Sequence, residues 1–221
     1  MFMLKLKIMK NIFLSFLILT LMLSCSSNDS NEAATDVAKE TTSVQGDYGD
    51  AWKINLEKSV ILWWGSKPTG VHNGTIGFKD GYINIEGGSI ANAKVSIDMS
   101  TIKVVDMNAE KNAKLENHLK TGDFFQIDLF PLASFELTTI DGADSALKVS
   151  GNLIIKDSTK NISFSAVSMT TDSSIHLVSD SFTIDRTKWG ITYKSNSIFD
   201  NLGEKFIDDQ VGIKLEIYGS K

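Results

Sequence analysis

Apolar side chains recur at every second position through most of this chain, and this period limits the possible fold more than any other feature. Val95, Ile97 and Met99, for example, alternate with polar residues. The same alternation occurs at Trp52, Ile54 and Leu56, at Leu147, Val149, Gly151, Leu153 and Ile155, and at Val211, Ile213, Leu215 and Ile217. A period of two belongs to a β-strand with one face buried and the other in water. The sequence from Ala51 onward therefore predicts strands.

Turn-forming residues separate these runs at short intervals. They occur at Lys79–Gly81, Glu86–Gly88, Asp141–Gly142 and Asp157–Ser158. Short connections of this kind join neighbouring strands as hairpins. We therefore expect an antiparallel sheet.

One segment departs from the strand pattern and predicts a helix. Asn108–Lys120 reads NAEKNAKLENHLK, with Asn108 placed as an N-cap and Gly122 just beyond the end. We expect the carboxylates Asp106, Glu110 and Glu116 near this helix to be simply solvated.

The unpaired edge strands of a long sheet limit the architectures that it can adopt. A long antiparallel sheet can remove its exposed edges by closing into a barrel. The two prolines, Pro68 and Pro131, both fall outside the alternating runs, as the hydrogen bonding of strands requires. An all-β barrel with one short helical insertion fits these observations, although a β-sandwich would show the same periodicity.

The N-terminal region carries the features of an export signal. Three lysines precede the apolar stretch Asn11–Leu23, which is shorter than the roughly 20 residues that span a bilayer as a helix. The stretch ends in Leu23-Ser24-Cys25, which resembles the lipobox of bacterial lipoproteins, and Cys25 is the only cysteine. We interpret residues 1–24 as a lipoprotein signal peptide and Cys25 as the acylated residue, with palmitate among its acyl chains. An ordinary cleaved signal peptide is the alternative.

Residues 25–50 predict a flexible tether, because this stretch is rich in Ser, Asn, Asp and Thr and contains little apolar surface to bury. We expect a cell-envelope protein held in a membrane through acylated Cys25. The outer membrane, facing the periplasm, is the expected site, with exposure at the cell surface as the alternative.

The charge of the chain argues against nucleic acid as a partner. Its formal net charge of −5 becomes −8 once the three lysines of the signal peptide are removed. A body of this charge repels phosphate backbones. Arg186 is the only arginine, so a clamp of several arginines is excluded as well.

Five segments together resemble the YceI-like family. They are Val95–Ile102 (VSIDMSTI), His118–Phe125 (HLKTGDFF), Phe130–Phe135 (FPLASF), Val149–Lys156 (VSGNLIIK) and Ile184–Ile191 (IDRTKWGI). Their order and spacing match the family over residues 51–221, although the turn at Lys156–Ser158 and the stretch Gly70–Gly74 depart from its usual pattern. The resemblance implies an extended, antiparallel, lipocalin-like β-barrel that holds a long isoprenoid, either a polyprenyl phosphate or an isoprenoid quinone, for storage or transport. It leaves a homodimer open. The alternative is a structural or stress-related envelope protein with a packed barrel and no ligand.

The candidate ligand-binding residues are large apolar side chains at inward-pointing positions, together with one arginine. They are Trp63, Ile76, Phe78, Val95, Ile97, Phe135, Leu137, Leu153, Phe164, Phe182, Ile184 and Arg186. Each apolar member also fits plain core filling, and Arg186 fits an exposed ion pair with Asp185 as well as a contact with a ligand oxygen. Phe124, Phe125 and Phe130 are expected to seat the helix against the barrel rim.

No enzyme motif is present in the sequence. His72, His118 and His176 are far apart and lack metal-ligand spacing. The glycines between Gly65 and Gly88 are not followed by a helical pattern, which excludes the usual phosphate-binding loops. We therefore expect a binding protein without catalytic residues, cofactor or metal, in which His72 alone has a ligand or proton role as an alternative.

Overall fold

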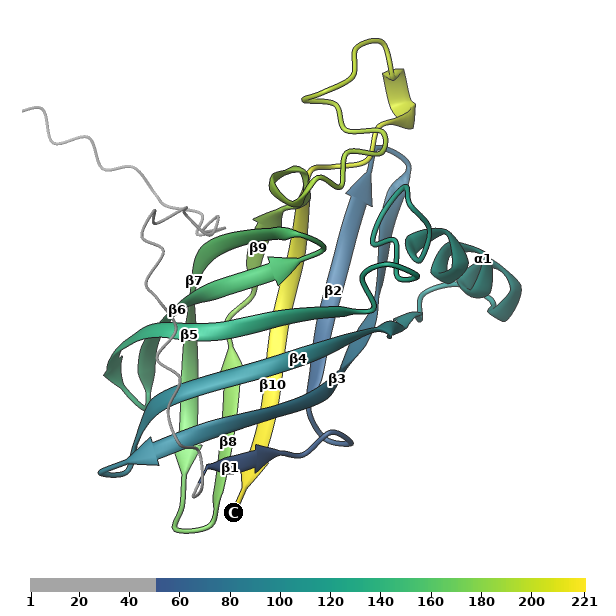
Figure 1. Cartoon of the computed structure of the whole chain (residues 1–221). Coiled ribbons are helices and arrows are strands. Elements are labelled where there is room, and N and C mark those ends of the chain that lie inside the picture. Colours follow the sequence, from purple (N-terminus) through teal and green to yellow (C-terminus); the bar gives the residue numbers. More distant parts are fainter. Residues whose placement is uncertain (1–50) are drawn as a thin grey trace, which may run out of the picture. The chain divides into compact units, whose positions relative to one another are not determined.

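The computed structural model of the protein describes residues 51–221; the predicted signal peptide, Cys25 and the tether lie outside the described residues. Within the described part there are ten strands, one α-helix and two short 3-10 helices (Figure 1). The strands are β1 (Trp52–Ile54), β2 (Val60–Lys67), β3 (Gly70–Glu86), β4 (Ser89–Val104), β5 (Leu132–Ala143), β6 (Ala146–Ile155), β7 (Ser158–Thr170), β8 (Ser174–Ser179), β9 (Phe182–Asp185) and β10 (Gln210–Ser220). The helices are α1 (Ala109–Leu119), η1 (Arg186–Trp189) and η2 (Gly203–Lys205).

The strands form one closed antiparallel ring. From β2 to β8 each strand pairs with the next along the chain. The last strand, β10, closes the ring, because it pairs with β2 on one side and with β8 and β9 on the other. The short strand β1 pairs with both β10 and β3. This closure confirms the predicted barrel and excludes the β-sandwich.

The predicted turn at Lys79–Gly81 is wrong, because these residues lie inside β3. The pairing of β3 with β4 shifts register between Thr75 and Gly77 and again between Phe78 and Asp80. Such bulges use the same glycine-rich and polar residue types as hairpin turns, but they bend a strand instead of ending it. β3 therefore continues for 17 residues around the barrel. The predicted turn at Glu86–Gly88 does connect β3 to β4.

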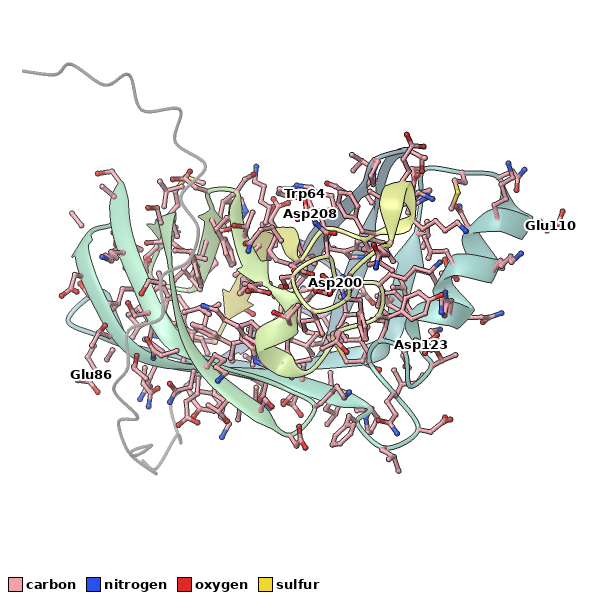
Figure 2. The ribbon with its side chains drawn as sticks, turned by 90° about the horizontal axis from the view of Figure 1, so that it is seen from above. Trp64, Glu86, Glu110, Asp123, Asp200 and Asp208 are labelled. Carbon is pink, nitrogen blue, oxygen red and sulfur yellow. The ribbon has the colours of Figure 1, made fainter. Side chains whose placement is uncertain are left out.

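The predicted helix is confirmed and lies at one end of the barrel. The Asn108 side chain accepts a hydrogen bond from the Lys111 N–H, as the N-cap prediction requires. Gly122 is not a left-handed C-terminal residue, because its φ is not positive. The helix is capped instead by Lys120, whose N–H bonds to the Glu116 carbonyl. Figure 2 shows Glu110 of α1 at one end of the barrel and Glu86 at the other.

Two carboxylates near the helix are not simply solvated, contrary to the sequence prediction. Glu116 accepts a hydrogen bond from the Val104 N–H at 2.9 Å and lies 3.6 Å from the Lys103 ammonium, so it ties α1 to β4. Asp106 accepts the Asn73 N–H at 3.1 Å and pairs with His72. Both were missed because their partners are strand residues that only the fold brings near.

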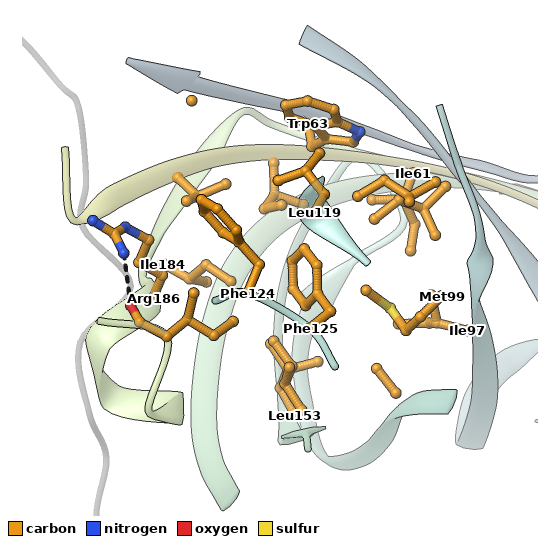
Figure 3. Close-up of a pocket in the computed structure, with 18 of the residues that line it drawn as sticks. Ile61, Trp63, Ile97, Met99, Leu119, Phe124, Phe125, Leu153, Ile184 and Arg186 are labelled. Atoms are coloured by element: carbon orange, nitrogen blue, oxygen red, sulfur yellow. Dashed lines mark hydrogen bonds between the residues drawn. The ribbon is translucent and has the colours of Figure 1, made fainter. Parts of the chain in front are cut away.

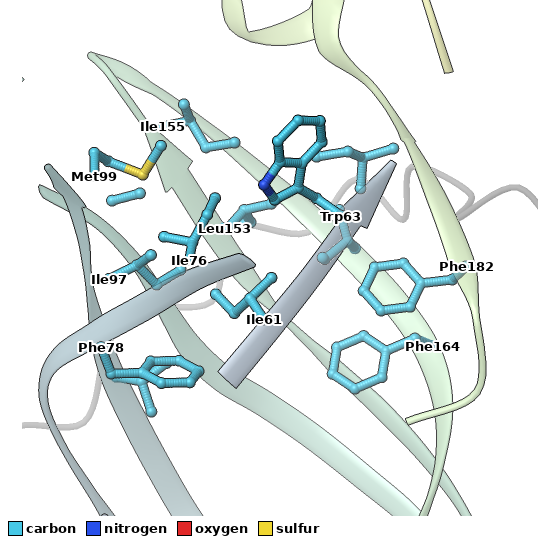
Figure 4. Close-up of a cluster of buried hydrophobic side chains, with 14 of the residues drawn as sticks. Ile61, Trp63, Ile76, Phe78, Ile97, Met99, Leu153, Ile155, Phe164 and Phe182 are labelled. Carbon is cyan, nitrogen blue, oxygen red and sulfur yellow. The ribbon is translucent and has the colours of Figure 1, made fainter. Parts of the chain in front are cut away.

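The interior of the barrel is apolar, as the alternating pattern predicts. The inward residues of β6, Leu147, Val149, Leu153 and Ile155, are all buried. Figure 4 shows side chains from β2, β3, β4, β6, β7 and β9 converging on this interior. Leu56, in contrast, lies beyond the end of β1 and is exposed. Within residues 51–221 no helix is long and apolar enough to cross a membrane.

Candidate functional site

The barrel encloses a cavity of about 950 Å³ that reaches the surface beside α1. This is the upper part of the size range of ligand pockets. All twelve residues that the sequence singled out line it: Trp63, Ile76, Phe78, Val95, Ile97, Phe135, Leu137, Leu153, Phe164, Phe182, Ile184 and Arg186. Their position on the cavity wall is thereby established, whereas their contact with a ligand stays a prediction.

Aromatic rings form one side of this wall. Phe164 and Phe182 are stacked with ring centroids 4.7 Å apart, and Phe135 lies 5.8 Å from Phe164. They come from β5, β7 and β9, so the contacts link strands that are distant in sequence. Ring stacking of this kind fixes the orientation of each side chain. These ring contacts therefore give this side of the wall a defined shape.

Two glycines make room for cavity-lining rings. A Cβ atom on Gly74 would lie 2.8 Å from Trp63 Cζ2 and 1.7 Å from the Lys103 carbonyl oxygen. A Cβ atom on Gly151 would lie 2.2 Å from Phe135 Cζ. Each ring thus covers the bare backbone of a neighbouring strand, and no larger residue fits at either glycine.

The mouth of the cavity is formed by α1, the segment 120–131 that follows it, the β2–β3 turn and the segment 190–209. His118 contacts the rings of Phe124 and Tyr193 edge-on, at 5.1 and 5.0 Å between centroids. Phe124 is buried and, with Phe125, lines the cavity below the helix (Figure 3). The sequence analysis expected both phenylalanines only to seat the helix, and it missed Tyr193, which lies outside any alternating run.

Arg186 is buried, contrary to the exposed ion pair with Asp185 that the sequence suggested. Its side chain is 4% exposed and donates to the carbonyl oxygens of Asp208, Ile191 and Ile207 at 3.0, 2.7 and 2.8 Å. It also lies 3.3 Å from Asp209 Oδ1, and Figure 3 shows one of the hydrogen bonds of Arg186 as a dashed line. Burial lowers the pKa of Arg186, while nearby carboxylates, Asp209 first, oppose this effect.

The role of Asp185 also differs from the prediction. Its side chain accepts the Thr187 N–H at 3.0 Å and so caps η1. Arg186 and Asp185 together hold the segment between β9 and β10 in place at the cavity mouth. Most of the guanidinium donors are therefore occupied by the chain itself and are not directed at a ligand.

Each of the three histidines is paired with a carboxylate. His72 Nδ1 lies 2.9 Å from Asp106 Oδ2, His118 Nε2 lies 2.9 Å from Asp123 Oδ2, and His176 Nε2 lies 3.1 Å from Glu216 Oε1. His176 also stacks on Tyr218 at 4.0 Å. His72 and His118 line the cavity at its mouth. Among residues 51–221 no group of three or more metal-binding side chains is close enough to hold an ion.

A hydrogen bond from the Tyr218 hydroxyl, at 2.9 Å, is the largest influence on Glu216 and lowers the pKa of its carboxyl. The same bond raises the pKa of Tyr218. This group lies on the outward face of β8 and β10, away from the cavity. It therefore stabilises the barrel wall and takes no part in the cavity.

The charged residues of the cavity lining are mostly cationic. The lining includes six lysines, Lys67, Lys94, Lys111, Lys114, Lys194 and Lys205, but only two carboxylates, Glu204 and Asp208. Most of these lysines are exposed at the mouth. The overall arrangement is an apolar tube with polar groups at its open end, which suits a long apolar ligand with a polar head.

Several proteins of known structure have a fold similar to this barrel. No curated protein shows significant similarity to the sequence. Among solved structures, BcnA of Burkholderia cenocepacia is similar with a TM-score of 0.61 and 17% identity, over 75% of this chain and 98% of BcnA. A polyisoprenoid binding domain from Saccharophagus degradans, implicated in plant cell wall breakdown, is similar with a TM-score of 0.60 and 13% identity, over 77% of this chain and 98% of that domain. At these identities the likeness concerns the fold.

The sequence also matches the model of a protein family. The match is to the YceI-like domain and covers residues 52–218, which include every strand of the barrel except the last residues of β10. This match and the shared barrel agree with the resemblance found in the five sequence segments. The chain therefore belongs to the YceI-like family.

Proposed function

We propose that this protein is a non-catalytic, lipid-anchored envelope protein that holds a long isoprenoid, a polyprenyl phosphate or an isoprenoid quinone, inside its barrel for storage or transport. The observation that carries the proposal is the apolar cavity of about 950 Å³ with its opening beside α1. The similar fold of a polyisoprenoid binding domain supports the choice of an isoprenoid.

Burial of the chain would supply most of the binding free energy. Each Å² of apolar surface removed from water contributes about 25 cal/mol. The rings of Phe135, Phe164 and Phe182 already hold one another in place, so they lose little conformational entropy when a ligand binds. Less of the favourable binding free energy is therefore offset. The alternative of a packed barrel without ligand is not favoured, because side chains leave this volume unfilled.

Mass spectrometry of an organic extract tests the proposal. The protein is purified folded from its native envelope, and the same amount of denatured, washed protein serves as control. We expect one isoprenoid at close to one molecule per chain. A clean extract, followed by failure of the folded protein to take up added isoprenoids, would overturn the proposal and favour the packed structural barrel.

The anchoring part of the proposal is supported by the sequence Leu23-Ser24-Cys25 and by the absence of a second cysteine. Acyl chains on Cys25 would hold the protein in a membrane, since each buried CH₂ contributes about 0.8 kcal/mol. The outer membrane, facing the periplasm, is the proposed location. A Cys25→Ala variant should incorporate no labelled palmitate, whereas equal labelling of both proteins would contradict acylation at this residue.

A further inference from the structure

Trp63 carries the one buried side-chain nitrogen or oxygen among residues 51–221 that lacks a hydrogen-bond partner. Its side chain is 8% exposed and lines the cavity. The buried indole of Trp189, in contrast, donates to the Leu153 carbonyl at 3.1 Å. Buried N–H groups in native proteins are nearly always paired, because an unpaired donor loses its bond to water without gaining another. The unpaired indole N–H of Trp63 is therefore unusual and needs an explanation.

The labelled side chains on the side of this donor are apolar. In Figures 3 and 4 the indole nitrogen lies on the side of the ring that faces Met99 and Ile97, which also line the cavity. The opposite strand offers Gly74, whose missing side chain lets the ring lean over the β3 backbone. No group among residues 51–221 bonds to this nitrogen, so a partner has to come from whatever fills the cavity.

We infer, on the basis of the proposed function, that the ligand places a neutral carbonyl oxygen at the Trp63 indole N–H, so that a quinone ring lies inside the tube below the mouth. A carbonyl oxygen accepts a hydrogen bond and brings no donor of its own. A single N–H in an apolar wall therefore satisfies it. A hydroxyl group would add an O–H that needs a further acceptor.

An ionised phosphate does not fit at this depth. Trp63 and Lys67 are four residues apart in β2, so Trp63 lies about 13 Å along the strand from the lysine at the mouth. A buried phosphate needs a cation beside it. The one arginine, Arg186, already donates to three backbone carbonyls and Asp209.

A phosphate at the mouth is also less favoured than the lining lysines suggest. The segments 109–131 and 190–209, which form most of the mouth, together contain eight carboxylates and five lysines. The lysines are largely exposed, so their charge is screened by water and salt. Binding of a phosphate head at this end is the competing outcome that the experiment below distinguishes.

The test compares two lipids of equal chain length on two variants. The probes are a benzoquinone with four isoprene units and geranylgeranyl phosphate. Trp63→Phe removes the N–H but keeps an aromatic ring. Trp64→Phe is the matched control, because the Trp64 ring lies against Gly212 on the opposite face of the same strand and does not line the cavity.

We expect Trp63→Phe to weaken quinone binding about 3- to 10-fold, the typical value of one hydrogen bond, and to change phosphate binding less than about 2-fold. Trp64→Phe should alter neither. Equal losses for both lipids would show that Trp63 only fills the wall and would overturn the inference while leaving the proposed function intact. Binding of neither lipid to the unaltered protein would overturn both.

A spectroscopic measurement keeps the inference testable if Trp63→Phe folds poorly. The chain has four tryptophans, so ¹⁵N labelling gives four indole N–H signals in the full protein. We expect the quinone to shift the Trp63 signal downfield, as a new hydrogen bond requires, and to leave the Trp189 signal, already bonded to Leu153, in place. An unchanged Trp63 signal with bound quinone would overturn the inference.

Discussion

The positions of individual glycines in this barrel are explained by the aromatic rings beside them. Gly74 and Gly151 each lie under a ring that lines the cavity, and on the outside the Trp64 ring covers Gly212 in the same way. From the sequence alone Gly151 fits the alternating run of its strand, whereas Gly74 falls in a stretch that resembles a turn. Their pairing with Trp63 and Phe135 depends on register between strands, which the sequence does not state.

Gly74→Ala should destabilise the fold by about 1–3 kcal/mol, because the new Cβ would collide with both the Lys103 carbonyl and the Trp63 ring. Chemical denaturation followed by circular dichroism measures the change. Gly65→Ala, where no atom lies within 4 Å of the new Cβ, is the control and should stay within about 0.5 kcal/mol of the original protein. Equal stability of both variants would contradict the described packing.

The candidate site was predictable from the sequence where the strand period applies, and not elsewhere. All eleven apolar candidates line the cavity because alternation identifies the inward face. Alternation does not show what lies outside the strands, so it missed Tyr193 and assigned Phe124 to the rim. The partners of Arg186 were hidden for a related reason, since three of them, Ile207, Asp208 and Asp209, are more than 20 residues away in an irregular segment.

At the scale of elements, α1 is held on the barrel by polar contacts as much as by apolar ones. Only Leu119 of the helix is buried. The Glu116 carboxylate, bonded to the Val104 N–H and near Lys103, fixes the helix to the end of β4. Sequence patterning predicted the helix and its N-cap, because both are local, but this attachment is not local.

Glu116→Ala should loosen α1 without unfolding the barrel, because it leaves the Val104 N–H unpaired at a cost of about 1–3 kcal/mol. Hydrogen exchange should become faster in residues 109–119 and remain unchanged in β6 and β7. Asn117→Ala, an exposed position on the same helix, provides the control. Faster exchange throughout the barrel, or none in the helix, would argue against this local attachment.

The β2–β3 hairpin is tied to the start of the helical region by Asp106. Burial alone would raise the pKa of its carboxyl, but hydrogen bonds from His72 and the Asn73 N–H outweigh this and lower it. A carboxyl with a lower pKa in the folded state adds stability above its unfolded pKa, near 4, and loses that contribution as the pH falls through the folded pKa.

Asp106→Asn should therefore lower the free energy of unfolding at pH 6. It should also make the loss of that free energy smaller as the pH falls below about 4. Urea unfolding at a series of pH values from 2 to 7 measures both effects. Asp172→Asn removes an exposed carboxylate from the turn between β7 and β8 and should leave the acid decline unchanged. If Asp106→Asn kept the full acid decline, the proposed contribution of this contact would be wrong.

At the scale of the whole molecule, the barrel is a shell around an unfilled centre. A cavity of this size deprives the lining side chains of contacts that a solid core would provide. A lipid bound as proposed would restore those contacts, and the stability of the protein would then depend on whether the cavity is filled. The overall architecture was predictable because one period runs through nearly the whole of residues 51–221, whereas the unfilled volume depends on how the strands curve.

Removal of bound lipid by denaturing purification and refolding should lower the Tm, and added isoprenoid should restore it. A ligand at 100 times its Kd stabilises the folded state by about 2.7 kcal/mol, which corresponds to a rise in Tm of roughly 5–10 °C for a domain of this size. Calorimetry with a saturated alcohol of equal length as control measures the difference. Identical Tm values with and without isoprenoid would indicate that nothing enters the barrel.

The pairing of β10, the last strand of the barrel in chain order, determines when the barrel can form. Its 11 residues pair with β1, β2, β8 and β9, so they join the beginning of the domain to its end. Contacts across so much sequence form slowly. Until Gln210–Ser220 have been synthesised, β2 and β8 remain open edges and no enclosed tube exists. A ligand can therefore be enclosed only after β10 has paired, and loss of this strand should leave two open strand edges that are prone to aggregation.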